Sequence, residues 1–145
     1  MTRNSGFTLI EISVVIGIFA IMATLGLLMS MDVWRGTSLQ AEQDIALSLL
    51  YKARSRAVAN IDETDHGLYI DSGAGKYTIF EGSSYLSADH SKDLSFDLND
   101  DFTFSGDDEV VFVAREGTAA SSTITISGEG KSRTFSINPE GGITW

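Results

Sequence analysis

The sequence contains no cysteine, one proline and two histidines. Without cysteine, disulfide bonds, thiol chemistry and thiolate metal sites are excluded, so any β-sheet must be held together by packing and hydrogen bonds. The proline, Pro139, lies close to the C-terminus beside two glycines, where its fixed φ suits a turn. These absences favour a structural or binding protein over one that works by thiol or zinc-thiolate chemistry.

Positive charge is also scarce. Ten Lys and Arg residues stand against 20 Asp and Glu residues, which gives a net charge of −10, and most of the acidic residues follow residue 60. A surface this acidic repels the phosphate backbone of nucleic acids. Nucleic acid is therefore not an expected partner.

Signatures of a catalytic centre are absent as well. His66 and His90 fall in polar stretches that we expect to be loops, and no nucleophile with a recognisable partner stands near either. Acyl-transfer motifs, phosphate-binding loops and zinc-ligand spacings are missing. The glycine-rich segment Gly73–Lys76 lies between two strand-like runs and opens no helix, so it is not a phosphate loop. We therefore do not expect an enzyme.

One long apolar run dominates what is present. Between Phe7 and Met31 the sequence has one charged residue, Glu11, and no proline. A run of more than roughly 18 apolar residues predicts a membrane-spanning helix, and it exceeds the roughly 7–15 apolar residues of a cleaved secretory signal. The 145 residues leave room for one small domain beyond this anchor.

Glu11 is the unusual residue of this run. A carboxylate inside a membrane helix costs roughly 2.5–3.5 kcal/mol at the bilayer centre and less near the headgroups. Glu11 is therefore either tolerated at headgroup depth or meets a positive partner when subunits assemble. A free amine on Phe7 would be such a partner, if the chain were cut between Gly6 and Phe7.

The segment Gly6-Phe7-Thr8-Leu9-Ile10-Glu11, behind a short polar leader that contains Arg3, resembles the class III signal of type IV prepilins and type II secretion pseudopilins. The resemblance implies that a prepilin peptidase cuts between Gly6 and Phe7 and methylates the new amine of Phe7. It also implies that Glu11 pairs with the N-terminus of a neighbouring pilin or pseudopilin subunit. The implied partners are this peptidase, the other subunits and, before assembly, inner-membrane lipid.

The flanking charges predict the orientation of the anchor. Arg3 and the initiator amine precede the apolar run, whereas Asp32 follows it before Arg35. By the positive-inside rule the N-terminus lies in the cytoplasm and the rest of the chain outside. We expect a single-pass protein of the inner membrane that later enters a pilus or pseudopilus.

Helical periodicity continues beyond the apolar run. Small and apolar residues recur at spacings of three, four and seven, which places them on one face: Leu39, Ala46, Leu49, Leu50, Ala53, Ala57 and Val58. The polar residues Gln40, Gln43, Asp44, Lys52, Arg54, Ser55 and Arg56 mostly fall on the other faces. The pattern predicts one helix from about Phe7 to Asn60, with a weak point at Gly36-Thr37-Ser38 because glycine disfavours a helix by roughly 1 kcal/mol.

Beyond His66 the period becomes alternating, which is typical of strands. A glycine-rich turn joins the first two runs into a predicted hairpin, and glycine, serine and acidic clusters separate the others. The predicted strands are 68–70, 77–80, 94–98, 102–104, 110–114, 123–126 and 134–137. Their aromatic residues are expected in the core of an antiparallel sheet: Tyr69, Tyr77, Phe80, Phe96, Phe102, Phe104 and Phe112.

Two segments resemble the H-type minor subunits of the same family. Lys52–Val58 is similar to the Ala-Arg-Ser-rich helix end that precedes their first strand, although an ordinary amphipathic helix end has the same composition. The ending Phe135–Trp145, with its strand, glycine turn and short final strand, is similar to their last hairpin. Together they imply a minor pilin or pseudopilin.

Two acidic clusters are the candidate metal sites. Oxygen-rich loops with alternate ligands suit Ca²⁺, and the first cluster consists of Asp97, Asn99, Asp100 and Asp101, the second of Asp107, Asp108 and Glu109. Neither matches an EF-hand loop, and solvated acidic turns have the same composition. Structural calcium and a plain acidic turn both remain open, and no other cofactor is expected.

The sequence thus predicts an α+β protein with a long N-terminal helix packed on an antiparallel β domain, as in pilins. Its segments are a leader (1–6), a transmembrane and assembly helix (7–31), an amphipathic continuation (32–60) and a β domain (61–145). The predicted function is that of a minor pilin or pseudopilin. The alternatives are a major pilin subunit, a tip-located DNA-uptake receptor, which the charge of −10 disfavours, and an enzyme anchored by a signal helix.

Overall fold

The computed structural model of the chain describes the backbone of residues 8–145 and the side chains of residues 8–25 and 36–145. One helix, α1 (Leu9–Val58), precedes all the strands and continues without interruption through Gly36-Thr37-Ser38. The chain divides into two compact units between Gly36 and Thr37. The boundary falls at Gly36, the first residue of the predicted weak point of the helix.

The first unit presents the apolar part of α1. Between residues 9 and 25 its large apolar side chains are exposed in the single chain, Leu9, Phe19 and Met22 among them. Among the residues whose side chains are described, no helix combines the length and hydropathy needed to cross a membrane. The predicted span, 7–31, includes residue 7 and residues 26–31, which lie outside that description.

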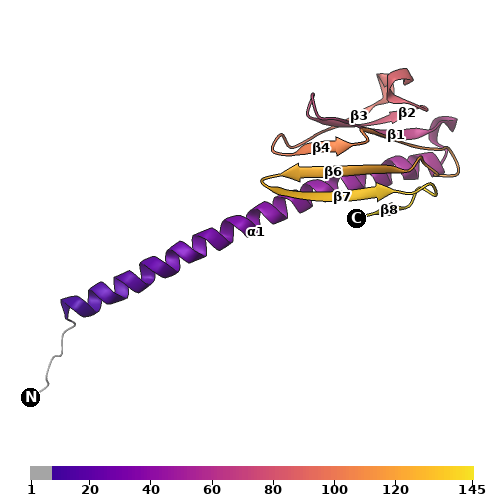
Figure 1. Ribbon diagram of the computed structural model, residues 1–145. Helices are drawn as coiled ribbons and strands as arrows, with labels where there is room; N and C mark the ends of the chain where they lie inside the picture. The colour runs from indigo at the N-terminus through magenta and orange to yellow at the C-terminus, as the bar shows by residue number, and fades with distance from the viewer. Residues whose placement is uncertain (1–7) are drawn as a thin grey trace, which may run out of the picture. The chain divides into compact units, whose positions relative to one another are not determined.

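The second unit, Thr37–Trp145, holds the end of α1 and two antiparallel sheets (Figure 1). Sheet A has the order β3-β2-β1-β5 and sheet B the order β4-β6-β7-β8. Their strands are β1 (His66–Asp71), β2 (Lys76–Glu81), β3 (Leu94–Asp97), β4 (Thr103–Gly106), β5 (Glu109–Phe112), β6 (Ser122–Gly128), β7 (Lys131–Ile137) and β8 (Ile143–Thr144). The predicted α+β class is confirmed, with two sheets where the sequence predicted one.

Both predicted hairpins form. In the first, Leu68 pairs with Ile79 across the glycine-rich turn, and in the last Ile137 pairs with Ile143 across the turn that contains Pro139. Residues 8–145 also contain three short 3₁₀ turns in the connections between these elements. They are η1 (Ile61–Glu63) between α1 and β1, and η2 (Tyr85–Ser87) and η3 (His90–Lys92) between β2 and β3.

The core lies between the end of α1 and the inner faces of both sheets. Leu39, Ala46 and Leu50 on the helix are buried in the same cluster as Ile79 of sheet A and Phe135 of sheet B. Of the residues predicted on the buried helix face all are buried except Val58, which is 49% exposed. Gln43, expected on an outer face, is buried. Four of the seven predicted core aromatics are buried, and Tyr69, Phe96 and Phe104 are half-buried.

The outer face of sheet A is covered by the loop between β2 and β3. Tyr85 of this loop stacks on Tyr69 with ring centroids 4.0 Å apart, and it meets the edge of Phe80 at 5.5 Å. Gly67 leaves room for the Phe80 ring, because a Cβ at that position would lie 2.4 Å from it. Sheet A is therefore packed on both faces.

Candidate functional site

The first candidate site is the N-terminus of α1. Gly6 and Phe7, the predicted processing residues, lie outside the described residues. Glu11 is described and exposed: its Oε2 accepts a hydrogen bond from the Thr8 backbone N–H at 3.4 Å, and the Thr8 hydroxyl oxygen accepts one from the Glu11 N–H at 3.3 Å. This reciprocal pair is a capping box, which satisfies two otherwise unpaired donors at a helix start.

The capping box gives Glu11 a partner within its own helix, in addition to the predicted partner on a neighbouring subunit. The signal was readable, since Thr followed three residues later by Glu before an apolar run is the pattern of a capping box. A role for Glu11 between subunits must therefore be tested against this role within one chain.

The second candidate site, the acidic loop Asp97–Asp101, is held by local hydrogen bonds. The Asn99 side-chain oxygen accepts from the Asp101 backbone N–H at 3.0 Å, and Asp97 stands opposite Lys76 at the end of the β2–β3 pair. Within the described part of the chain no group of three or more acidic or histidine side chains is placed to hold a metal ion. Asp97, Asn99, Asp100 and Asp101 form an acidic loop in this structure, and calcium binding by this loop stays a prediction.

The second acidic cluster anchors loops. The Asp107 carboxylate accepts a hydrogen bond from the Thr123 N–H at 3.0 Å, which ties the β4–β5 connection to β6. Glu109 accepts from the Tyr85 N–H at 3.1 Å and so holds the loop that covers sheet A. These carboxylates have structural partners within the domain.

A buried hydrogen bond between Glu42 and Tyr77 joins the helix to sheet A. The Tyr77 hydroxyl donates to Glu42 Oε1 at 2.7 Å, and both residues are buried. Burial, followed by the hydrogen bond to Glu42, raises the pKa of Tyr77 well above its ordinary value of 10. The pair fixes the position of the helix on sheet A through a buried polar contact, and helical periodicity alone does not indicate Glu42.

A second polar cluster gathers around Glu81 at the end of β2. The Arg56 guanidinium contacts Glu81 Oε1 at 2.7 Å, Lys92 contacts Oε2 at 3.4 Å, and His66 Nε2 lies 3.6 Å from Oε1. Lys92 also pairs with Asp62 at 3.2 Å. The cluster thus connects the last turn of α1 with η1, the first hairpin and η3.

His66 is the most enclosed member of this cluster. We predicted a polar loop here, which was wrong: His66 is the first residue of β1 and is fully buried, with Nδ1 3.0 Å from the Thr64 carbonyl oxygen. Desolvation, followed by the nearby positive charge of Arg56, lowers its pKa. The arrangement holds a neutral imidazole, and no nucleophile completes it into a catalytic centre among its described partners.

A third contact ties the end of α1 to the C-terminal turn. Arg54 donates from Nε to the Gly117 carbonyl oxygen at 3.2 Å and from a terminal nitrogen to the Glu140 carbonyl oxygen at 3.3 Å. Gly117 and Gly141 have φ of +66° and +73°, and each would place a Cβ against its neighbours. The two segments that resemble H-type minor subunits, Lys52–Val58 and Phe135–Trp145, are therefore in contact with each other.

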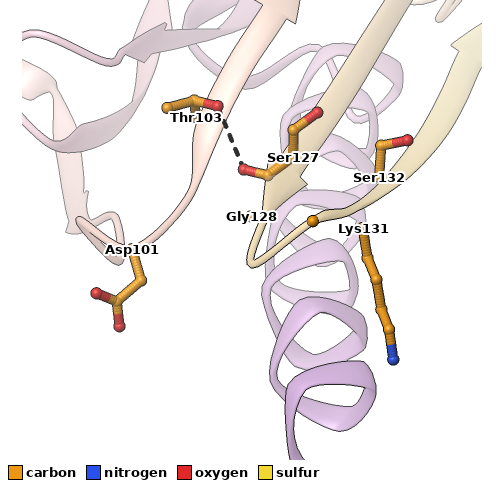
Figure 2. Close-up of a pocket in the computed structure, with 7 residues that line it drawn as sticks. Asp101, Thr103, Ser127, Gly128, Lys131 and Ser132 are labelled. Atoms are coloured by element: carbon orange, nitrogen blue, oxygen red, sulfur yellow. Dashed lines mark hydrogen bonds between the residues drawn. The ribbon is translucent and has the colours of Figure 1, made fainter. Parts of the chain in front are cut away.

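A shallow polar hollow of about 450 Å³ lies at one end of sheet B (Figure 2). Its lining includes Thr103, Ser127 and Ser132, and the Thr103 hydroxyl donates to the Ser127 carbonyl oxygen at 3.3 Å. Sequence patterns do not indicate this hollow, because it forms only where β4 pairs with the β6–β7 hairpin.

Comparison with known proteins gives two matches. Residues 1–27 match the model of the prokaryotic N-terminal methylation motif. The fold matches the solved structure of the minor pseudopilin EpsH from the type 2 secretion system of Vibrio cholerae, with a TM-score of 0.55 and 12% sequence identity, over 73% of this chain and 94% of that chain. No curated protein matches the sequence significantly.

These matches agree with the resemblance inferred from the sequence. The methylation motif covers the segment that contains Gly6, Phe7 and Glu11, and the fold over 73% of the chain is similar to that of a minor pseudopilin. Processing at Gly6, methylation of Phe7 and pairing of Glu11 stay predictions.

Proposed function

We propose that this chain is a structural subunit of the type IV pilin and pseudopilin class, in the role of a minor subunit of a type II secretion pseudopilus or a related pilus. The observation that carries the proposal is the combination of an N-terminal methylation motif over residues 1–27 with a fold that is similar to a minor pseudopilin over 73% of the chain. Neither feature is accounted for by an anchored enzyme.

In this proposal the chain has four functional segments. Residues 1–6 are a leader that a prepilin peptidase removes, and the new amine of Phe7 is methylated. Residues 7–31 hold the protein in the inner membrane with the N-terminus in the cytoplasm, and later pack against neighbouring subunits. Residues 32–60 extend the helix onto the domain 61–145, which lies outside the membrane.

Glu11 would carry the assembly step. In the membrane its carboxylate lies near the headgroups, whereas in a bundle of helices an unpaired charge would cost several kcal/mol. The amine of a neighbour's Phe7 offsets that cost and sets the register between adjacent helices. The capping box with Thr8 is compatible with this, because a carboxylate has two oxygens and can accept more than one hydrogen bond.

The main alternative is a major subunit, which the N-terminal motif serves equally well. The fold match to a minor pseudopilin favours the minor role. Copy number decides between the two: quantitative mass spectrometry of sheared filaments should find this chain at a small fraction of the most abundant subunit. Equal abundance would identify a major subunit.

Processing is tested at the N-terminus of the mature protein. We expect mass spectrometry of the filament-associated chain to show that it begins at Phe7 and carries a methylated amine. A mature chain that still begins at Met1 would contradict the assignment.

Two substitutions of Glu11 separate its roles. Glu11→Gln keeps a side chain able to complete the capping box but removes the charge, whereas Glu11→Leu removes both. If Glu11 pairs with an amine between subunits, both variants insert in the membrane and are cleaved, yet incorporate poorly into filaments. Ser13→Ala is the matched control. Ser13 lies two residues after Glu11, and the substitution deletes a hydroxyl that donates to the Leu9 carbonyl oxygen.

Immunoblots of sheared filaments give the readout. Wild-type incorporation of Glu11→Gln together with a defect in Glu11→Leu would leave helix capping as the role of this residue. Normal incorporation of both would make Glu11 a tolerated side chain.

A further inference from the structure

The outward face of sheet B carries a regular array of hydroxyl groups. Residues that are paired across antiparallel strands point to the same face, so the register defines three cross-strand rows. The rows are Thr103, Ser127 and Ser132; Ser105, Thr125 and Thr134; and Thr123, Ser136 and Thr144. All nine residues of this hydroxyl face are exposed or half-buried, whereas the alternate residues Ile124, Ile126, Phe135 and Ile137 fill the core.

The composition of the hydroxyl face is unusual for this chain. None of its nine residues is charged, although charged residues make up 21% of the sequence and the net charge is −10. None is aromatic or aliphatic either. The outer face of sheet A, in contrast, is closed by the loop that carries Tyr85.

The hydroxyl groups keep hydrogen-bonding capacity. Thr125 pairs with Thr134 and Ser136 with Thr144, each at 2.9 Å between hydroxyl oxygens. A hydroxyl has one donor and two acceptor positions, so such a pair leaves several positions for a ligand. Strands lie roughly 4.8 Å apart and alternate residues roughly 6.8 Å apart along a strand, so the face presents a grid of donors and acceptors.

The polar hollow is continuous with this grid. Its lining includes Thr103, Ser127 and Ser132, which form the first row, and it has a volume of about 450 Å³. Asp101 stands on one side of it and Lys131 on the other (Figure 2). A hollow of this size exceeds the lower end of ordinary ligand sites, roughly 300 Å³, and its walls offer hydroxyl groups beside apolar carbon atoms.

We propose that the hydroxyl face of sheet B, together with the hollow at its first row, binds a neutral polysaccharide. A neutral sugar chain is itself a row of hydroxyl groups that both donate and accept, which matches the grid. It also carries no charge, so the net charge of −10 does not oppose its approach. This inference does not depend on the proposed function.

Two other classes of partner fit less well. Anionic polymers such as nucleic acids need a cluster of Lys and Arg, which the nine residues do not supply. Protein interfaces are centred on aromatic, aliphatic or Arg anchors, and these are absent from the same nine positions. Of the partner classes considered, a polar, uncharged ligand held by many hydrogen bonds fits the hydroxyl face best.

The test uses the full chain in lauryldimethylamine oxide, a detergent without a sugar headgroup that could compete. Sedimentation with insoluble cellulose, chitin and starch measures binding to neutral polysaccharides, and insoluble alginate is the anionic control. We expect saturable binding to at least one of the three neutral polymers and none to alginate. Absence of binding to all three, or equal binding to alginate, would overturn the proposal.

The double variant Thr125→Val/Thr134→Val removes one cross-strand hydroxyl pair while it keeps β-branched side chains on exposed strand positions. We expect its binding to be about tenfold weaker, the effect of losing roughly two hydrogen bonds. Thr118→Val, which deletes a hydroxyl in the loop after β5, is the matched control and should bind like the wild type.

Circular dichroism and the thermal midpoint verify that each variant is folded. Unchanged binding by the folded double variant would refute the role of this face. A third outcome would also refute the proposal. If the wild type binds none of the neutral polymers and the double variant fails to enter filaments, the hydroxyl face contacts a protein partner.

Discussion

At the scale of single residues, the domain is held in register by a few buried and half-buried polar contacts. The hydrogen bond from Tyr77 to Glu42 and the cluster around Glu81 each join α1 to sheet A. A buried polar group that loses its partner is costly, so such contacts specify which packing of the helix on the sheet is acceptable.

Tyr77→Phe should destabilise residues 37–145 by about 1–3 kcal/mol, because it leaves the buried Glu42 carboxylate without its hydroxyl donor. Urea unfolding followed by circular dichroism measures the change. Tyr69→Phe, at a half-buried ring on the other face of sheet A, is the control and should change stability by less.

A double-mutant cycle checks the cause. Adding Glu42→Leu to Tyr77→Phe removes both polar partners, so the combined loss should be smaller than the sum of the two single losses. Additive losses would show that the hydrogen bond does not couple these residues.

His66 predicts a pH dependence of stability. Its pKa in the folded state lies below the ordinary value of 6.5, so the neutral imidazole is favoured by folding. The contribution of the neutral His66 imidazole to the free energy of unfolding is fully present above pH 6.5. It is lost as the pH falls through the lowered pKa of His66. The urea midpoint of the wild-type domain should therefore decrease between about pH 7 and 5.

The contribution of His66 is isolated by comparing how steeply the urea midpoint changes with pH in the wild type and in a variant. Asp62, Lys92, Arg56 and Glu81 surround His66 and remain in the variant. His66→Gln should flatten the decrease, because it removes the buried imidazole whose pKa is lowered. Identical slopes for wild type and His66→Gln would place the acid sensitivity elsewhere.

At the scale of elements, the C-terminal hairpin is fitted to the end of α1 by backbone contacts that leave no room for side chains. A Cβ at Gly141 would lie 1.9 Å from the Gly117 carbonyl oxygen, and Arg54 donates to that same oxygen. The two segments that resembled H-type subunits in sequence are therefore complementary in structure.

Gly141→Ala should destabilise the domain strongly, by several kcal/mol, since it adds both the strain of a positive φ and a clash with backbone. Gly130→Ala is a matched control: its φ of +79° carries the same backbone strain, but nothing lies within 4 Å of its Cβ. Thermal unfolding of both variants measures the difference. Equal losses would show that the close approach at Gly141 relaxes without cost.

At the scale of the whole molecule, charge and apolar surface are divided between the two compact units. The exposed apolar side chains of residues 9–25 belong to the first unit, whereas most acidic residues belong to the second. This division suits a subunit that assembles through its helix and presents an acidic domain.

The acidic domain should have little affinity for nucleic acid. Residues 37–145 should show no more than weak, non-specific binding to DNA at physiological salt, because their net charge opposes the phosphate backbone. Fluorescence anisotropy with a labelled duplex at ~150 mM salt measures this. Sub-micromolar binding would instead favour a DNA-uptake receptor.

Much of this protein follows from local sequence. The motif Gly6–Glu11, the helix of period 3.6 and the alternation of the strands depend on neighbours within a few residues, so pattern and propensity suffice to predict them. The hairpin of Leu68 and Ile79 was predictable for the same reason, since its turn is short and rich in glycine. The capping box of Thr8 and Glu11 belongs to this local class too.

Tertiary structure alone decided which residues far apart in the chain meet. The burial of His66, the exposure of Val58 and the contact of Glu42 with Tyr77 depend on how α1 lies on the sheets, which helical periodicity does not specify. The division of the strands into two sheets depends likewise on long-range pairing, and it is this pairing that aligns Thr103, Ser127 and Ser132 into one row. Alternation shows that a strand has two faces, but only the register between strands shows which side chains share a surface.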